Sequence, residues 1–428
     1  MINKVQNLLA SEGFRQSSVM IFGNLAAVSM SALAMILISR SLGPAQFGEF
    51  SVGFALVLIL ARISDLGLTN AQLKFIPTSK TESEKNNIFS LAIQFKLIVS
   101  LLILIVGWLL TPWLTALLNF QQPLILYISF AANLATVLYE QLAVMLQSLH
   151  RVKQAVNINA VQAATKLTAA LGLFLVASNA TVPAYALYVL APLAPVVFAQ
   201  LFLPTWWKLS ISSRYKKEEQ LIKSMASHAA IGFMAAGVIE NIDVLFVQGY
   251  LNEYETGLLA GASRIAMLVS LAGYSLANVL NPRVARYTDL KHFNAYFKKA
   301  ILIALGAVVL FVVSLPVSGL LIRFTIGDAY LPATNILQIL LASSFLTLAS
   351  VPFIAMFFSF KRADWYFSIS GILQMAIMIF GNWWYVPVYG VAAAAWTRVA
   401  TKVFLFGFTV AIAWHYARKL QSQQLSRG

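Results

Sequence analysis

Ten ionisable side chains lie within long apolar stretches of this 428-residue chain. Six are basic and four acidic: Arg62, Lys96, Lys166, Arg264, Arg398 and Lys402, with Asp65, Glu140, Glu240 and Asp243. Inside a membrane such residues usually face a water-filled cavity or a partner, because a charge in lipid is costly. The excess of cations suits a cavity that receives phosphate groups, since Arg and Lys pair readily with phosphate oxygens.

Arg62 and Asp65 are three residues apart in "LARISDLGL", so on a helix they share a face and can pair. Two interpretations follow from this spacing. The pair serves only to lower the cost of both charges, or Arg62 is a cavity cation that Asp65 orients. We favour the second interpretation.

Polar side chains recur at helical spacing around Glu140 and around Lys166. The short connection "SLHRVK" makes the two helices antiparallel neighbours, which predicts a Glu140–Lys166 pair. The polar residues line a cavity or hold the helices together, because both roles are common in membranes. We expect cavity lining by Asn24, Asn133, Asn159 and Gln162.

A second group of charges lies in the C-terminal half. Glu240 and Asp243 share one helix face, where two carboxylates could bind and release a proton or a sodium ion. Alternatively, each pairs with a base on another helix, such as Arg264. Arg398 and Lys402 also share a face, which is unfavourable unless an anion lies opposite. A phosphate could meet this need, and so could Glu240 or Asp243.

These residues must be positioned by membrane helices. The chain is 60% hydrophobic and 11% charged, with a mean hydropathy of +0.78. About twenty apolar residues suffice to cross ~30 Å of hydrocarbon as a helix. We predict twelve spans, at about 17–39, 48–69, 87–110, 123–147, 155–177, 183–203, 226–250, 257–280, 296–324, 333–359, 365–385 and 390–415. Prolines within them, such as Pro192, predict kinks.

The basic residues predict the orientation of these spans. Of the 30 Lys and Arg, 22 lie in the termini or the even-numbered connections, whereas the odd-numbered connections hold only Arg40 and Arg323. By the positive-inside rule both termini are cytoplasmic. The formal charge of +15 is therefore mostly a topology signal, and its scatter over short loops argues against nucleic-acid binding.

The chain also repeats itself. "AQFGEFSVGFALVLILARISDLGLTNAQLK" from Ala45 matches "YETGLLAGASRIAMLVSLAGYSLANVLNPR" from Tyr254 at a shift of 209, which places Gly48 on Gly257. We predict two six-helix halves, residues 1–213 and 224–428, joined by a cytoplasmic linker at 214–223. An even number of spans per half predicts a pseudo-two-fold axis along the membrane normal, with the substrate path between the halves.

"SRSLGPAQFGEFSVGFALVLILARISDLGL" (39–68) resembles the polysaccharide-biosynthesis (Wzx-type) flippases of the multidrug/oligosaccharidyl-lipid/polysaccharide exporter superfamily. The matching features are the turn Leu42-Gly43-Pro44 with Phe47-Gly48 and the ending Asp65-Leu66-Gly67. The resemblance extends over the whole chain by helix number and division. It implies a MATE-like all-α fold and alternating-access flipping of an undecaprenyl-diphosphate-linked oligosaccharide across the bacterial inner membrane.

The resemblance has further implications for the site and its partners. Lipid II flippases of the same superfamily use cavity arginines, for which Arg62 and Arg264 are the nearest matches by span. A polysaccharide polymerase and a chain-length regulator are implied partners. We expect Arg62, Arg264, Arg398 and Lys402 to converge on one cavity between the halves.

Alternative functions are a multidrug or cation antiporter of the same superfamily and a membrane glycosyltransferase or polymerase. The first would be expected to carry an acidic cavity, and the second needs a large outer loop, which is not evident here. The chain has no Cys, no "GxxxxGK[ST]" and no "HExxH", so we expect a transporter without cofactor or metal rather than an enzyme.

Overall fold

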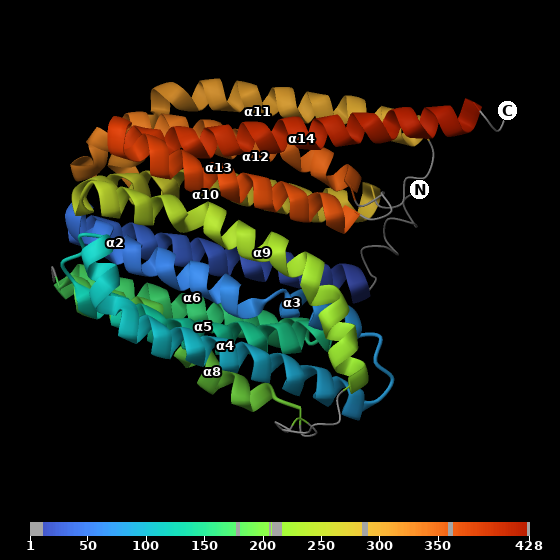
Figure 1. Ribbon diagram of the computed structural model, residues 1–428, viewed down its shortest axis with the longest axis horizontal. Helices are drawn as coiled ribbons and strands as arrows, with labels where there is room; N and C mark the ends of the chain where they lie inside the picture. The colour runs from blue at the N-terminus through green and yellow to red at the C-terminus, as the bar shows by residue number, and fades with distance from the viewer. Residues whose placement is uncertain are drawn as a thin grey trace. The chain divides into compact units, whose positions relative to one another are not determined.

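The computed structural model describes residues 12–176, 180–204, 207, 216–284, 290–357 and 363–425. In this part of the chain the structure is helical and contains no β-strand (Figure 1). The predicted all-α membrane fold is confirmed. The helices are α2 (Glu12–Asp65), α3 (Leu68–Phe75), α4 (Glu82–Leu117), α5 (Pro123–Ser148), α6 (Val152–Val176), α7 (Thr181–Val189), α8 (Leu193–Ala199), η1 (Gln200–Phe202), α9 (Lys216–Tyr250), α10 (Glu253–Val284), α11 (Leu290–Thr325), η2 (Asp328–Ala333), α12 (Thr334–Phe357), α13 (Ala363–Tyr389) and α14 (Val391–Leu425).

Ten segments of the described residues are long and apolar enough to cross a membrane. One of them covers most of α2, which holds two of the predicted spans. The predicted span 226–250 falls in α9, where many side chains lie outside the described residues. The number twelve and the two-fold axis therefore stay predictions.

Local sequence explains two breaks in this arrangement. Inside α2, Gly43 has φ 71° and ψ 175°, a conformation that is essentially restricted to glycine. Pro44 follows, has no amide hydrogen to donate, and begins the second segment of α2. The predicted sixth span is likewise broken, because α7 ends at Val189 and α8 begins only after Pro192.

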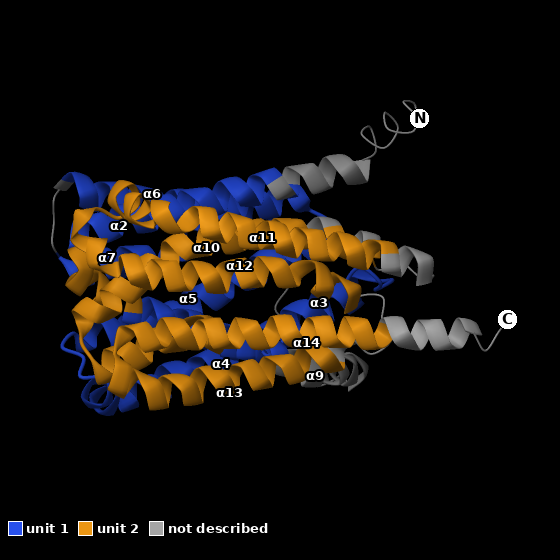
Figure 2. Cartoon of the chain, turned by 90° about the horizontal axis from the view of Figure 1, so that it is seen from above, with its two compact units in different colours: residues 1–42, 52–237 blue, residues 43–51, 238–428 orange. Residues whose placement is uncertain are grey.

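The chain divides into two compact units, shown in Figure 2. Unit 1 comprises residues 1–42 and 52–237, and unit 2 comprises residues 43–51 and 238–428. A short piece of α2, from Gly43 to Ser51, thus packs with unit 2. Of the predicted linker, residues 214 and 215 lie outside the described residues, and 216–223 form the first turns of α9.

In unit 1, α5 packs against α3, α4, α6, α7 and α8. One buried apolar cluster, centred on Ile76, Phe89 and Met145, joins α4 and α5 to the end of α3. The outer surface of α4 carries large exposed apolar side chains, Leu102 and Leu109 among them. Such a surface suits contact with lipid tails, since it would be unfavourable in water.

In unit 2, α12 is the central helix and packs against α10, α11 and α14. Phe353, Met356 and Phe357 of α12 form a buried core with residues of α10, α11 and α14. Helix α11 presents exposed apolar residues such as Leu302 and Val309, again as expected of a lipid-facing helix. Each unit thus presents at least one helix with a largely apolar exposed surface.

Candidate functional site

Each unit carries its own cluster of the predicted ionisable residues. Unit 1 holds Arg62, Asp65, Lys96, Glu140 and Lys166, and unit 2 holds Glu240, Asp243, Arg264, Arg398 and Lys402. Their convergence on one cavity stays a prediction. Within each cluster, however, the structure decides which charges are paired and which remain exposed.

Asp65 is the last residue of α2, at the point where the chain turns into α3. Leu66 and Gly67 both have positive φ, 49° and 74°, and α3 starts at Leu68. Glycine tolerates this region readily, whereas Leu does so at an energetic cost. The "DLG" ending is therefore a helix break that the surrounding contacts must hold in place.

Lys96 of α4 supplies those contacts. Its Nζ lies 2.6 Å from Oδ1 of Asp65 and donates to Oγ1 of Thr69 at 3.0 Å. Thr69 in turn donates to Asp65. The Lys96 side chain is only 1% exposed, so this is a buried ion pair. Lys96 was predicted to bind substrate, but its ammonium is committed to Asp65 and Thr69.

Arg62 pairs with Glu140 and not with the predicted Asp65. Its Nη2 lies 3.5 Å from Oε1 of Glu140 on α5, and its side chain is 45% exposed. The predicted Arg62–Asp65 pair is wrong, because Asp65 turns toward α4 and Arg62 toward α5. A single contact at 3.5 Å is weak. Arg62 thus keeps donors accessible to an anionic ligand.

Lys166 of α6 lies over the ring of Tyr188, with Nζ 4.9 Å from the ring centroid. This cation–π contact accommodates the charge against an aromatic face. Glu140 forms an ion pair with Arg62. The predicted pair between Glu140 and Lys166 stays a prediction.

The polar stripes separate into buried and partly buried residues. Asn133 is fully buried and exchanges hydrogen bonds with Ser64, which indicates a role in holding α5 to α2. Asn159 accepts from Tyr139 at 2.8 Å and donates to Asn24 at 2.9 Å. Asn24, Asn133 and Asn159, together with the partly buried Gln162, remain candidates for cavity lining.

Sequence reasoning missed one buried pair. Gln72 of α3 and Gln141 of α5 donate to each other, at 3.1 and 2.6 Å. The available signal was the position of Gln72, four residues after Leu68 on the face of α3 that also carries the buried Leu68.

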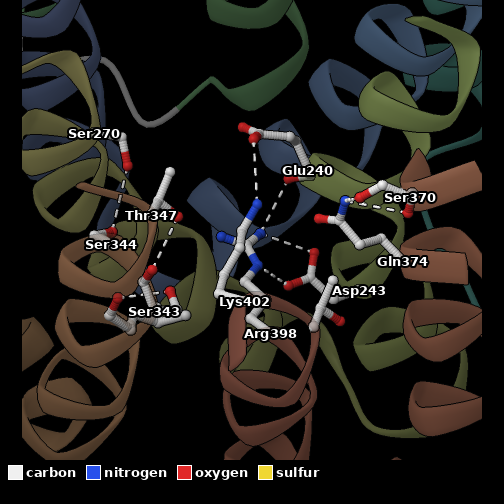
Figure 3. A network of polar contacts seen from close by, with 12 residues as sticks. Glu240, Asp243, Ser270, Ser343, Ser344, Thr347, Ser370, Gln374, Arg398 and Lys402 are labelled. Atoms are coloured by element: carbon white, nitrogen blue, oxygen red, sulfur yellow. Dashed lines mark hydrogen bonds and ion pairs between the residues drawn. The ribbon is translucent and has the colours of Figure 1, made fainter. Parts of the chain in front are cut away.

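In unit 2, Glu240 and Asp243 of α9 are paired with Lys402 and Arg398 of α14 (Figure 3). Arg398 donates from Nε and Nη2 to the two oxygens of Asp243, at 2.5 and 2.9 Å. Its Nη2 also donates to the carbonyl oxygen of Glu240 at 3.1 Å. Asp243 is fully buried. This bidentate pair is a strong, geometrically specific contact between α9 and α14.

The second pair is looser. Lys402 Nζ lies 3.9 Å from Oε1 of Glu240, whose side chain is 55% exposed. The interpretation that both carboxylates pair with bases on another helix is confirmed, but the partners are Arg398 and Lys402. Arg264, the suggested partner, lies partly buried on α10. Arg398 and Lys402 share a helix face, and the anions that lie opposite them are the carboxylates of Asp243 and Glu240.

The described residues contain no group of three or more His, Asp or Glu side chains that could hold a metal ion. Among the clustered charges, Arg62 of unit 1 is 45% exposed, and the Glu240–Lys402 pair of unit 2 is loosely held.

The comparisons with known proteins bear on the family and the fold. The model of the polysaccharide biosynthesis protein family matches residues 14–288, more than half of the chain. The chain belongs to this polysaccharide biosynthesis family. The resemblance seen in residues 39–68 is thereby confirmed. No protein of curated function matches the chain by sequence.

Solved structures show what fold this member of the polysaccharide biosynthesis family has. An inward-facing multidrug resistance MATE transporter of the MOP superfamily superposes with a TM-score of 0.70, at 13% identity, over 94% of this chain and 96% of the other. The lipid II flippase MurJ, inward closed, gives 0.71 at 13% identity over 95% and 92%. A MOP superfamily transporter from Pyrococcus furiosus gives 0.60 at 13% identity over 95% of both chains. The MATE-like fold is confirmed.

Proposed function

We propose that this protein flips an undecaprenyl-diphosphate-linked oligosaccharide from the cytoplasmic to the periplasmic leaflet of the bacterial inner membrane. The observation that carries the proposal is the family match combined with the exposed guanidinium of Arg62. The fold shared with a lipid II flippase supports a lipid-linked substrate. The sugar moves by alternating access while the ~55-carbon tail implied by the resemblance stays in lipid.

The structure refines the roles proposed for the charged residues. Arg62 and Lys402 contact the diphosphate or acidic sugars, because each is held only by a single contact, at 3.5 and 3.9 Å. Lys96 and Arg398 instead hold helices together through buried carboxylates. The half-exposed Glu240 is the better candidate for proton or sodium coupling, since Asp243 is fully engaged by Arg398.

A multidrug or cation antiporter is the alternative, and the same fold supports it. Two observations favour the flippase. The family is one of polysaccharide biosynthesis, and the ionisable residues within the predicted spans carry an excess of cations, which disfavours a cationic substrate. The polymerase and the chain-length regulator are the proposed partners, and both termini are proposed to be cytoplasmic.

Deletion of the gene tests the function. We expect surface polysaccharide to disappear while lipid-linked oligosaccharide accumulates on the cytoplasmic face, measured by extraction of both fractions. Complementation with the full chain should reverse both changes. Polymer that still reaches the surface, in a strain without another flippase, would refute the proposal.

A further inference from the structure

Gly237 of α9 lies directly against the side chain of Arg62. Both residues belong to unit 1, and Gly237 is buried. A methyl group added to Gly237 would overlap Cγ of Arg62, and it would lie 2.6 Å from Cβ and 3.7 Å from Cδ of the same residue. These are the three nearest heavy atoms apart from the adjoining residues of α9. The aliphatic stem of Arg62 therefore lies across the backbone of α9, in the space that the absent side chain leaves.

The space at Gly237 serves this one side chain. Small residues in membranes commonly let two helix backbones approach closely. Gly48 and Gly257 show that case, because a methyl group added to either would overlap a backbone carbonyl oxygen of the other segment. At Gly237 the nearest atoms all belong to the side chain of Arg62. Glycine is less favourable than alanine inside a helix, and the stem of Arg62 gives its presence here a physical reason.

The atoms that meet Gly237 lie at the start of the Arg62 side chain. Cβ moves only with the backbone of α2, and Cγ changes place only when χ1 changes to another staggered rotamer. A small movement of the guanidinium group therefore could not make room for a side chain at position 237. Either α2 and α9 would move apart locally, or the Arg62 side chain would take another direction. Both changes relocate the guanidinium group.

The far end of Arg62 is held only loosely. Its Nη2 lies 3.5 Å from Oε1 of Glu140 on α5, and the side chain is 45% exposed. An ion pair with this exposure contributes little, so it does little to fix the direction of the side chain. Packing of the stem on Gly237 fixes that direction without using any donor of the guanidinium group. Arg62 is thus held in place and still has donors for a ligand.

We propose that Gly237 is a positioning residue for substrate binding: the space it leaves for the stem of Arg62 directs the guanidinium group to the place where the diphosphate binds. The proposal rests on the flippase function. Gly237 acts through Arg62 and needs no contact of its own with the substrate. A side chain that is already in its binding direction loses less conformational freedom when the ligand arrives, which favours binding.

Substitution of Gly237 in the full chain tests the proposal. Gly237→Ala should lower polysaccharide export about tenfold, the effect expected for loss of one charge-assisted contact. Gly172→Ala is the matched control, because this glycine lies in α6 of the same unit and an added methyl group would meet nothing within 4 Å. The control should export like wild type. Export would be compared at matched membrane levels.

The chemical reactivity of Arg62 separates positioning from a general structural effect. Phenylglyoxal modifies accessible guanidinium groups, and mass spectrometry of the purified protein gives the rate at each arginine. We expect the rate at Arg62 to change severalfold in Gly237→Ala and to stay unchanged in Gly172→Ala. Arg323, whose side chain is 63% exposed, is the internal reference. An unchanged rate at Arg62, or wild-type export by Gly237→Ala, overturns the proposal.

A compensating variant decides the question if Gly237→Ala does not reach the membrane. Arg62→Gly removes Cβ, Cγ and Cδ, the three atoms that the new methyl group would meet. Combined with Gly237→Ala, it should restore the membrane level. Failure to restore it overturns the proposal, since Gly237 would then be required by another contact. Failure of the flippase function is distinguishable, because the wild-type chain would not restore polysaccharide while the phenylglyoxal rate at Arg62 would still respond to Gly237→Ala.

Discussion

At the scale of single residues, exposure and contact distance separate charges that hold the fold from charges left available to a ligand. Lys96 and Asp65 are buried and 2.6 Å apart, whereas Arg62 is 45% exposed and 3.5 Å from Glu140. An exposed pair contributes little to stability, typically ~0–1 kcal/mol. The same arginine can contribute far more to binding, since a hydrogen bond to a charged group is worth about 1.5–3 kcal/mol.

Arg62→Ala is therefore expected to impair transport without unfolding the protein. Loss of one charge-assisted contact predicts a fall in polysaccharide export of about tenfold or more. Arg62→Lys, which keeps the charge but not the planar fork, should fall between Ala and wild type. Export would be measured at matched membrane levels of each variant. The control is Arg323→Ala, which removes an exposed ion pair with Asp328 and should leave export unchanged. Full export by Arg62→Ala would exclude Arg62 from binding.

At the scale of elements, the ion pairs fix how helices end and which helices are neighbours. The Asp65–Lys96 pair ties the end of α2 to α4, directly beside the two positive-φ residues that precede α3. The Asp243–Arg398 pair ties α9 to α14 in the same manner. In both cases removing one partner leaves a buried charge without compensation, which is costly.

Lys96→Ala should accordingly destabilise the protein by about 3–5 kcal/mol, the range typical of a broken buried pair. Thermal unfolding of the detergent-purified protein measures this change. The double variant Asp65→Asn with Lys96→Met should recover much of the loss, because no uncompensated charge remains. A melting temperature for Lys96→Ala equal to that of Arg323→Ala would contradict the assigned role of the pair.

At the scale of the whole molecule, the chain forms two units, and a short segment of α2 packs with unit 2 while the rest of that helix belongs to unit 1. Residues 43–51 belong by sequence to the first predicted half but pack in unit 2, where they meet their repeat equivalents. This contact connects the repeat in the sequence with a physical feature of the fold. Its predicted outer location depends on the orientation of the chain.

The orientation can be tested with reporter fusions. A reporter after Lys217 should read cytoplasmic and one after Asn179 periplasmic, because the basic residues cluster in the even-numbered connections. Alkaline phosphatase and a fluorescent protein give opposite signals at each site and serve as mutual controls. Reversed signals at both sites would overturn the topology and place the contact between Gly48 and Gly257 on the cytoplasmic side.

The sequence alone determined the class of protein, the helical fold and the positions of the main breaks. Hydropathy over about twenty residues decides whether a helix is stable in lipid, and this property is local. The same holds for Gly43-Pro44 and for Leu66-Gly67, whose backbone preferences act within a few residues. The family resemblance also lay in one continuous stretch, residues 39–68.

Only the tertiary structure decided the partners of the charges. Helical spacing correctly put Arg62 and Asp65 near each other, but their partners come from α5 and α4. Likewise Glu240 and Asp243 pair with Lys402 and Arg398 of α14. The physical reason is that an ion pair requires contact within about 4 Å, and this depends on how each helix is rotated and placed in depth against its neighbours. Those quantities arise from the packing of whole helices and are not encoded in any single stretch of sequence.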